Sequence, residues 1–276
     1  MSGIITLTTD FGLEDEYVGV MKGVILTLAP TTSIIDLSHG IKPQNIVHAA
    51  HTIYNGSNYF PDNAVHVVVV DPGVGGSRRL ILVGARRQLF LAPDNGVLSL
   101  LLNKREFTFA RAVTNEELFL KPVSGTFHGR DILAPVAAHL ADGLPSEKVG
   151  PPLECSELTQ LDLAASLSPD GRSIKGTVIQ IDHFGNLITN IDRQTVQELG
   201  ITNQSHLTVE IGHRVITGIN VCYEESEPGG VLALFGSRDY LEIAINQGDA
   251  GKILGISIGE IVQLHTDKKV PLQATQ

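Results

Sequence analysis

The chain has few cysteines and no long apolar run. Among its 276 residues there are two cysteines, Cys155 and Cys222, which lie far apart and form no CxxC pair. Neither a disulfide scaffold nor a zinc–thiolate site is expected, and a reducing cytoplasmic location is predicted. No apolar run approaches the roughly 20 residues that a membrane-spanning helix needs, so we expect no membrane partner. Residues 1–6 lack the basic start and apolar core of a signal peptide and are typical of a first strand.

Positive charge is also scarce. The chain has 20 basic against 30 acidic residues, a net charge of −10, which repels the phosphate backbone of nucleic acids. Its short basic pairs are more typical of a solvated surface than of a nucleic acid interface: Arg78-Arg79, Arg86-Arg87 and Lys104-Arg105. We therefore expect no nucleic acid partner. With 42% hydrophobic and 18% charged residues, the chain can bury a core, which excludes a disordered protein.

The first half of the chain alternates between strand-like and helix-like segments. Strands are predicted at 4–9, 33–37, 65–70, 80–83 and 89–92, and helices at 17–28, 45–54 and 132–140. The run 65–70 is rich in valine, which is typical of a strand buried on both faces of a parallel sheet. Asp131 is expected to cap the last helix. This order predicts a layered α/β domain with a mostly parallel sheet.

The pattern changes in the second half. Four prolines interrupt residues 144–170, which we expect to form a connector. Beyond it we predict one helix at 194–199 and short strands at 173–181, 207–209, 215–222, 231–235, 241–245 and 261–264. Their spacing is typical of a small β-barrel or a sandwich. The sequence therefore predicts two domains, an α/β domain at 1–165 and a smaller β domain at 166–276.

Polar residues follow several predicted strands of the first domain. Ligands of open α/β sheets lie beyond the carboxyl ends of the strands, and Asp10 and Asp71 occupy such positions. The segment 71–79 combines a carboxylate, glycines for a tight turn and two arginines, and it matches neither the P-loop nor the GxGxxG pattern. Taken alone, this segment could equally be a plain glycine turn.

Three further clusters contain candidate functional groups. The segment 124–131 places His128 among small residues that leave it accessible. The segment 182–190 is rich in amide and carboxyl groups, which a simple turn would also favour. The segment 237–242 ends in Glu242, which either faces solvent or belongs to a pocket.

Residue types alone leave the chemistry open. Carboxylates and imidazoles at strand ends suit divalent metals. A metal-dependent hydrolase would take its ligands from Asp10, Asp36, His39, Asp71 and His128. However, the closely spaced histidines are limited to one pair on the second predicted helix, His48 and His51. Spacing alone therefore predicts only an α/β enzyme with a polar pocket.

Taken in order, the clusters resemble one family over nearly the whole chain. The segments that carry the resemblance are 9–12, 17–23, 71–75, 93–96, 126–131, 184–186 and 189–191. They resemble the S-adenosyl-L-methionine (SAM) hydroxide adenosyltransferases, which are SAM hydrolases related to the fluorinase and the chlorinase. The resemblance implies an α/β domain followed by a β-barrel, and a homotrimer with active sites between one subunit's first domain and its neighbour's second. It also implies hydrolysis of SAM to adenosine and L-methionine without a metal or other cofactor.

The resemblance also implies roles for individual residues. Asp71, Arg78 and His128 are implied to handle the attacking water, and the halogenases have a tyrosine where this chain has Asp71, which favours hydroxide over halide. The implied substrate-binding residues are Asp10 at the ribose, Phe127 at the nucleoside, Asp182 and Asn186 at the adenosine, Asp15, Ser237 and Arg238 at the methionine end, and, as a further candidate, Glu242. A SAM-dependent halogenase and a SAM- or adenosine-binding protein without turnover are the alternatives.

Overall fold

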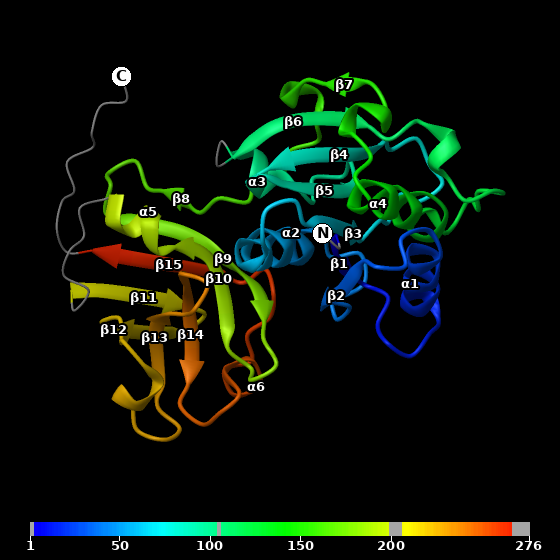
Figure 1. The fold of residues 1–276 in the computed structure, drawn as a ribbon. Helices are drawn as coiled ribbons and strands as arrows, with labels where there is room; N and C mark the ends of the chain where they lie inside the picture. The colour runs from blue at the N-terminus through cyan, green and yellow to red at the C-terminus, as the bar shows by residue number, and fades with distance from the viewer. Residues whose placement is uncertain (1–2, 104–105, 199–205, 267–276) are drawn as a thin grey trace. The chain divides into compact units, whose positions relative to one another are not determined.

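The computed structural model describes residues 3–103, 106–198 and 206–266. The chain forms two compact units, Met1–Asp162 and Leu163–Gln276, each with its own sheet and core (Figure 1). The first unit runs from blue to green in Figure 1 and the second from green to red. Within the described ranges, no helix is both long enough and apolar enough to span a bilayer.

The first unit is built on a seven-stranded sheet in the order β2-β1-β3-β5-β4-β6-β7. Its strands are β1 (Ile4–Thr9), β2 (Ser33–Ser38), β3 (Val65–Val69), β4 (Leu80–Ala85), β5 (Gln88–Pro93), β6 (Phe107–Ala112) and β7 (Pro152–Leu153). Strands β2, β1, β3 and β5 pair in parallel, whereas β4 and β7 run opposite to the other strands. The sheet is therefore mostly parallel, as predicted, and every residue of β3 is buried.

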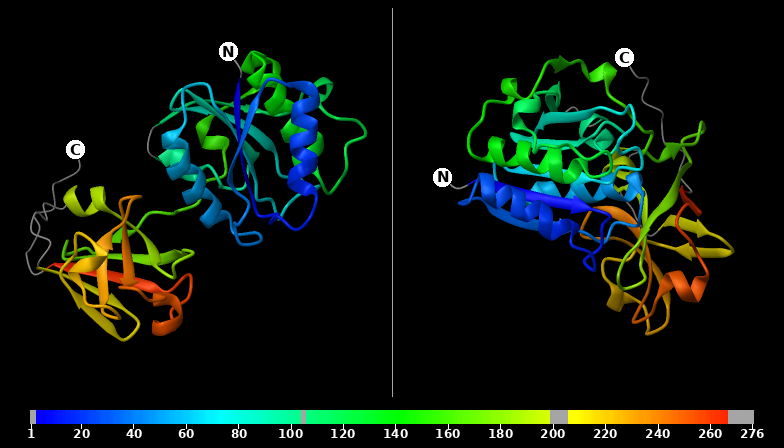
Figure 2. Two further views of the ribbon diagram at one scale, coloured as in Figure 1. Left: turned by 60° about the horizontal axis from the view of Figure 1, so that its bottom comes forward. Right: turned by 90° about the vertical axis from the view of Figure 1, so that its right-hand side faces the viewer.

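Helices cover both faces of this sheet (Figures 1 and 2). Helices α1 (Tyr17–Leu28) and α4 (Ala134–Ala141) pack against one face, and α2 (Ile46–Gly56) and α3 (Ser99–Asn103) against the other. Because successive side chains of a strand point to opposite faces, β3 contributes to both cores. Val67 and Val69 belong to the core with α1 and α4, and Val68 to the core with α2 and α3.

The register of the parallel strands determines where the polar residues gather. Thr9, the last residue of β1, pairs with Val69, the last residue of β3. Asp10 and Asp71 therefore leave the sheet at the same edge, beyond the carboxyl ends of two neighbouring strands. This is the edge at which open α/β sheets bind ligands.

The second unit is an eight-stranded antiparallel sheet in the order β12-β11-β15-β9-β10-β14-β13, with β8 paired to β9. Its strands are β8 (Ser166–Leu167), β9 (Ser173–Ile181), β10 (Leu187–Asp192), β11 (Leu207–Ile211), β12 (Arg214–Thr217), β13 (Val231–Phe235), β14 (Tyr240–Ile245) and β15 (Ile261–Thr266), and its helices are α5 (Arg193–Glu198) and α6 (Ala250–Leu254). Beyond β12, the N–H of Asn220 donates to the Ala233 carbonyl at 2.7 Å. This bond links the two ends of the sheet, which is nearly closed into a barrel.

Short helical turns complete the two units. The 3₁₀ turns are η1 (Ser57–Tyr59), η2 (Glu116–Leu118), η4 (Ser146–Lys148), η5 (Cys155–Glu157) and η7 (Tyr223–Glu225), and η3 (Gly129–Leu133) is a π-helix that continues into α4.

Some elements differ from the sequence prediction. The strand predicted at 215–222 ends at Thr217, because Gly218 has a positive φ of 82° that breaks the extended run. The segment 182–190, interpreted as turn-like, forms a turn at its start, where the Gly185 N–H donates to the Asp182 carbonyl at 3.1 Å, and then enters strand β10. There the Asn190 side chain accepts the Thr177 N–H at 2.8 Å and donates to the Leu163 carbonyl at 3.1 Å, instead of forming a turn.

Asp131 does not cap a helix, contrary to our expectation. The helix begins earlier, with the π-turn η3, so Asp131 lies inside it and is fully buried. Its carboxylate accepts the N–H of Ser124 at 2.7 Å and pairs with Arg130. Of the other predictions, the last residue of helix 194–199 and the pair Lys104-Arg105 lie outside the described residues.

Candidate active site

The three side chains predicted to handle water meet in the first unit. Asp71 and Arg78 lie on the loop between β3 and β4, and His128 directly precedes η3. Arg78 Nε donates to the two carboxylate oxygens of Asp71 at 3.1 and 2.9 Å, and Nη2 donates to Oδ2 at 2.5 Å. The same Nη2 lies 2.8 Å from Nδ1 of His128. The Asp71 and Arg78 side chains are 6% and 12% exposed, so this ion pair is largely shielded from water.

A close backbone contact brings the two loops together. Gly75 has a φ of +76°, and a Cβ at this position would lie 2.2 Å from the carbonyl oxygen of Gly125. Only glycine combines this conformation with this approach. On the same loop, the Gly73 N–H donates to Asp71 Oδ1 at 3.2 Å, which fixes the carboxylate against its own turn. The glycines of segment 71–79 therefore allow Asp71 and Arg78 to reach His128.

The contact with Arg78 determines the protonation of His128. A guanidinium has donors and no acceptor, so Nδ1 of His128 accepts the hydrogen bond and the imidazole is neutral with its proton on Nε2. Burial lowers the pKa of His128 below 6.5, and the charge of Arg78 lowers it further, while the carboxylates of Asp71 and Asp131 act in the opposite direction. Geometry and electrostatics both favour a neutral histidine.

Asp71 and His128 face a cavity of about 310 Å³ in the first unit, whose lining also includes Asp10 and Phe127. One carboxylate oxygen of Asp10 accepts the Gln44 N–H at 2.7 Å. The Phe127 ring is held edge-on by its aromatic neighbours, with centroids 5.8 Å from Phe11 and 5.3 Å from Tyr17. The cavity thus combines an aromatic wall with carboxylates and an imidazole.

Asp15 does not join this group. It is exposed in the loop that precedes α1 and is not among the residues that line the cavity. Its predicted part in binding the methionine end therefore has no support from the geometry of the first unit.

The remaining predicted residues line a cavity of about 940 Å³ in the second unit; they are Asp182, Asn186, Ser237, Arg238 and Glu242. The Asp182 carboxylate accepts the N–H groups of Phe184 and Asn186, both at 2.9 Å, and the Asn186 side-chain amide at 3.1 Å. Arg238 donates to the side chain of Gln180 at 2.8 Å. The side chains of Asp182, Asn186 and Arg238 are therefore held in place by hydrogen bonds before any ligand binds.

Glu242 faces this cavity and not the solvent, with only 6% of the residue exposed. Its carboxylate accepts the hydroxyl of Tyr223 at 2.5 Å. Burial raises the pKa of Glu242 and the charge of Asp182 raises it further, although the Tyr223 hydrogen bond and Arg238 act in the opposite direction. Tyr223 also lines the cavity, and sequence reasoning missed it because it lies just beyond a segment predicted as a strand.

The residues of the metal-site alternative separate into two groups. His39 Nε2 lies 3.0 Å from Asp36, and its Nδ1 lies 2.8 Å from the Thr9 hydroxyl. Asp36 also pairs with Lys22 at 2.6 Å, while the carboxylate of Asp71 is occupied by Arg78. In the described part of the chain, no three His, Cys, Asp or Glu side chains are grouped in a way that could hold a metal ion.

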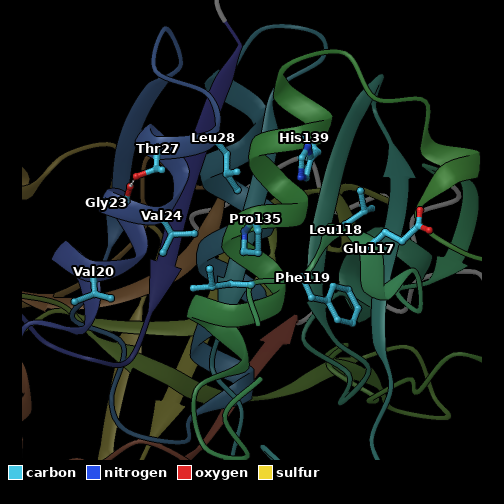
Figure 3. Close-up of a pocket in the computed structure, with 11 residues that line it drawn as sticks. Val20, Gly23, Val24, Thr27, Leu28, Glu117, Leu118, Phe119, Pro135 and His139 are labelled. Atoms are coloured by element: carbon cyan, nitrogen blue, oxygen red, sulfur yellow. Dashed lines mark hydrogen bonds between the residues drawn. The ribbon is translucent and has the colours of Figure 1, made fainter. Parts of the chain in front are cut away.

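A further cavity, of about 430 Å³, is chemically different. It lies between α1, α4 and residues 117–120, and its lining is mainly apolar (Figure 3). The hydroxyl of Thr27 donates to the Gly23 carbonyl at 2.8 Å, so this polar group is bonded within its own helix. Figure 3 shows His139 and Glu117 on separate elements at this cavity. The residues that line this cavity include no acid and base in contact with each other, unlike Asp71, Arg78 and His128.

Comparisons with known proteins agree with the resemblance of the sequence motifs. The family model for the SAM hydroxide adenosyltransferase N-terminal domain matches residues 5–150, and the model for the C-terminal domain matches residues 176–263. An (R)-S-adenosyl-L-methionine hydrolase from Thermus thermophilus is 38% identical over 263 residues, covering 93% of this chain and 97% of the relative. A fluorinase from Actinopolyspora mzabensis is 28% identical over 271 residues, covering 88% and 90%.

A solved structure supports the fold over nearly the full length. The crystal structure of an uncharacterized conserved protein from Thermotoga maritima superposes with a TM-score of 0.87 at 37% sequence identity, covering 95% of this chain and 99% of the other. The two family models together match more than half of the chain. The chain therefore belongs to the SAM hydroxide adenosyltransferase family.

Proposed function

We propose that this protein hydrolyses SAM to adenosine and L-methionine. The observation that carries the proposal is the Asp71–Arg78–His128 group beside the cavity that Asp10 and Phe127 also line. The relative from Thermus thermophilus, named as an (R)-S-adenosyl-L-methionine hydrolase, supports the substrate. A halide is less suited to this cavity than water, because the Asp71 carboxylate would repel an anion.

The reaction is an in-line displacement at C5′ of the nucleoside. The oxygen of water forms a bond to C5′ as the C5′–S bond breaks, and the electron pair of that bond moves to sulfur. Methionine leaves as a neutral thioether, the oxygen becomes the 5′-hydroxyl of adenosine, and one proton of the water is released. The leaving group therefore needs no acid, and the work of the site is to hold and deprotonate water.

The protonation of His128 supports a division of roles. A neutral His128 that accepts from Arg78 through Nδ1 carries its proton on Nε2, so we propose that it donates to the water oxygen and orients it. Asp71 then accepts the released proton. Attack by water produces a positively charged oxygen that is far more acidic than a carboxylic acid, so Asp71 need not be a strong base. Correct placement of the water contributes most, because effective molarities of well-placed groups can be very large.

The remaining residues are proposed to bind the substrate. Asp10 accepts the ribose hydroxyls and Phe127 packs against the nucleoside. In the second unit, Asp182 and Asn186 contact the adenosine, Ser237 and Arg238 hold the methionine end, and the buried Glu242 completes the cavity lining. Asp15, exposed on its loop, is also proposed at the methionine end.

We further propose that the protein is a cytoplasmic homotrimer with active sites between subunits. The family resemblance supports the trimer, and the two groups of predicted residues lie in different units of the chain. Cys155 and Cys222 are free thiols, which suits a reducing compartment.

The decisive experiment is incubation of the purified protein with SAM in ¹⁸O-labelled water. Because the names of the relatives specify the R form, the two sulfonium epimers are supplied separately. We expect adenosine with ¹⁸O in its 5′-hydroxyl, and one equivalent of L-methionine. Binding of SAM without products would indicate a binding protein, and formation of 5′-chloro-5′-deoxyadenosine in added chloride would indicate a halogenase; either result overturns the proposal.

Variants of the water-handling residues test their roles. Asp71→Asn and His128→Ala are expected to lose turnover while SAM still binds, because neither residue is proposed to hold the substrate. Asp10→Ala is expected mainly to raise the KM for SAM. Calorimetric titration with SAM alongside initial rates separates the two effects, and an equal loss of affinity and rate at Asp71 would contradict its role.

A further inference from the structure

The first end of the loop that carries Asp71 and Arg78 is anchored by Asn95. Its side-chain amide donates to the carbonyl of Val70, the residue directly before Asp71, at 2.9 Å. Its amide oxygen accepts the Val97 N–H at 3.2 Å, which fixes the orientation of the amide. Strand β3 ends at Val69, so the Val70 carbonyl is bonded to this side chain at the point where the chain leaves the sheet.

The second end of the loop is anchored by Asp94, the neighbour of Asn95. The Asp94 N–H donates to the carbonyl of Arg79, the residue directly after Arg78, at 2.9 Å. The Asp94 carboxylate accepts Nε and Nη2 of the Arg79 side chain at 3.1 and 2.7 Å, and its second oxygen accepts the Thr159 N–H at 2.8 Å. Its side chain is only 4% exposed, so the charge of Asp94 is fully engaged.

We propose that Asp94 and Asn95 are positioning residues for the hydrolysis, because they fix both ends of the loop that carries Asp71 and Arg78. This inference rests on the proposed function. Neither residue is among those that line the 310 Å³ cavity, so neither is proposed to touch substrate. They act through Val70 and Arg79. The turn after β5 (Gln88–Pro93) thereby determines where the carboxylate and the guanidinium meet His128.

A purely structural role is the competing explanation, and a matched pair of variants separates the two. Asn95→Ala removes the bond from an asparagine amide to the Val70 carbonyl. Asn55→Ala removes a similar bond, from the Asn55 amide to the His51 carbonyl at 2.8 Å, inside helix α2 and away from the loop. Both variants are expected to lower the Tm. Only Asn95→Ala is expected to lower kcat, by about ten- to a hundredfold with KM nearly unchanged, because small misplacements of reacting groups are costly.

A double variant tests whether Asn95 acts through Asp71. If it does, Asn95→Ala causes no further loss of kcat in an Asp71→Asn background, because the group that it positions is already absent. Multiplicative losses in the double variant, or equal losses of kcat in Asn95→Ala and Asn55→Ala, would overturn the inference.

Amide hydrogen exchange tests the anchoring without any assay of turnover. Exchange within residues 71–79 is expected to accelerate in Asn95→Ala and to stay as in the wild type in Asn55→Ala. Unchanged exchange in this loop refutes the anchoring even if the enzyme is active. If the wild-type protein releases no adenosine from SAM, the proposed function fails while the exchange result still decides whether Asn95 holds the loop.

Discussion

At the scale of single residues, the site depends on a position where a side chain would not fit. Gly75 combines a positive φ with a backbone contact to Gly125. We predict that Gly75→Ala separates the two loops and lowers kcat by at least about tenfold, since Arg78 can then no longer bridge Asp71 and His128. Steady-state kinetics with SAM, together with a thermal melt, measure the effect.

The other side of the same contact provides the control. A Cβ on Gly125 would meet nothing within 4 Å. Gly125→Ala is therefore expected to behave as the wild type. Equal losses in both variants would mean that neither loop tolerates a substitution, and that the close approach at Gly75 is not the cause.

The neutral state of His128 predicts a pH dependence. Its pKa in the folded protein lies below 6.5, mainly because of burial and the charge of Arg78. The unfolded chain therefore binds more protons as the pH falls below 6.5, and the free energy of unfolding contributed by this group decreases. The activity should also decrease as the pH falls, because a protonated His128 cannot accept the hydrogen bond from Arg78.

A rate profile tests this prediction. We expect kcat/KM to fall on the acid side with an apparent pKa below 6.5. The residual rate of His128→Asn should lack this limb. An acid limb above 6.5 in the wild type, or one that persists unchanged in the variant, would contradict the assignment.

The family resemblance predicted one part of the site better than the other. It named Asp71, Arg78 and His128, whose side chains meet although Arg78 lies seven residues from Asp71 and fifty from His128. Tyr223 and the burial of Glu242 could not be predicted, because both depend on how the barrel brings η7 (Tyr223–Glu225) beside β14 (Tyr240–Ile245). Long-range pairing of this kind leaves no periodic signal in the sequence.

At the scale of secondary-structure elements, the same limit applies. The buried valine run of β3 was predictable because a strand buried on both faces needs apolar residues throughout. The strand β10 (Leu187–Asp192) was not predicted, because its polar residues are typical of turns and their partners lie on distant segments. The start of the helix after His128 was also predicted too late. The π-turn η3 leaves no sequence signature that distinguishes it from a loop.

The π-turn leads to a prediction about Asp131. Removing its buried carboxylate leaves the Ser124 N–H and the Arg130 guanidinium without this partner. Asp131→Ala is expected to lower the free energy of unfolding by about 1–3 kcal/mol at neutral pH. Chemical denaturation of the variant and the wild type measures the difference.

The pH dependence of that difference provides the check. Burial works to raise the pKa of Asp131, but the hydrogen bonds from Arg130 and Ser124 outweigh it and the pKa is lowered below 3.8. The stabilisation by the Asp131 carboxylate is therefore complete above pH 3.8 and is lost as the pH falls through the lowered pKa of Asp131. The difference in the free energy of unfolding between the wild type and Asp131→Ala should therefore become smaller in strong acid. A difference that does not change with pH would assign the loss to packing alone.

At the scale of the whole molecule, the predicted site residues are divided between the two units. Asp71, Arg78 and His128 belong to the first, and Arg238 to the second. In a ring of subunits with sites between neighbours, a chain defective in one unit can complement a chain defective in the other. Co-expression of an Asp71→Asn chain with an Arg238→Met chain tests this directly, with a different affinity tag on each so that mixed oligomers can be purified.

Mixed trimers purified through both tags set the expected size of the effect. In each such trimer one of the three sites between neighbours combines an intact first unit with an intact second unit, so the activity per site should recover to about a third of the wild type. Co-expression of Asp71→Asn with His128→Ala is the matched control. Both defects lie in the first unit, so no arrangement of chains restores a complete site. Recovery in the first mixture but not in the control requires sites shared between subunits, whereas no recovery in purified mixed oligomers means that each chain builds its site alone.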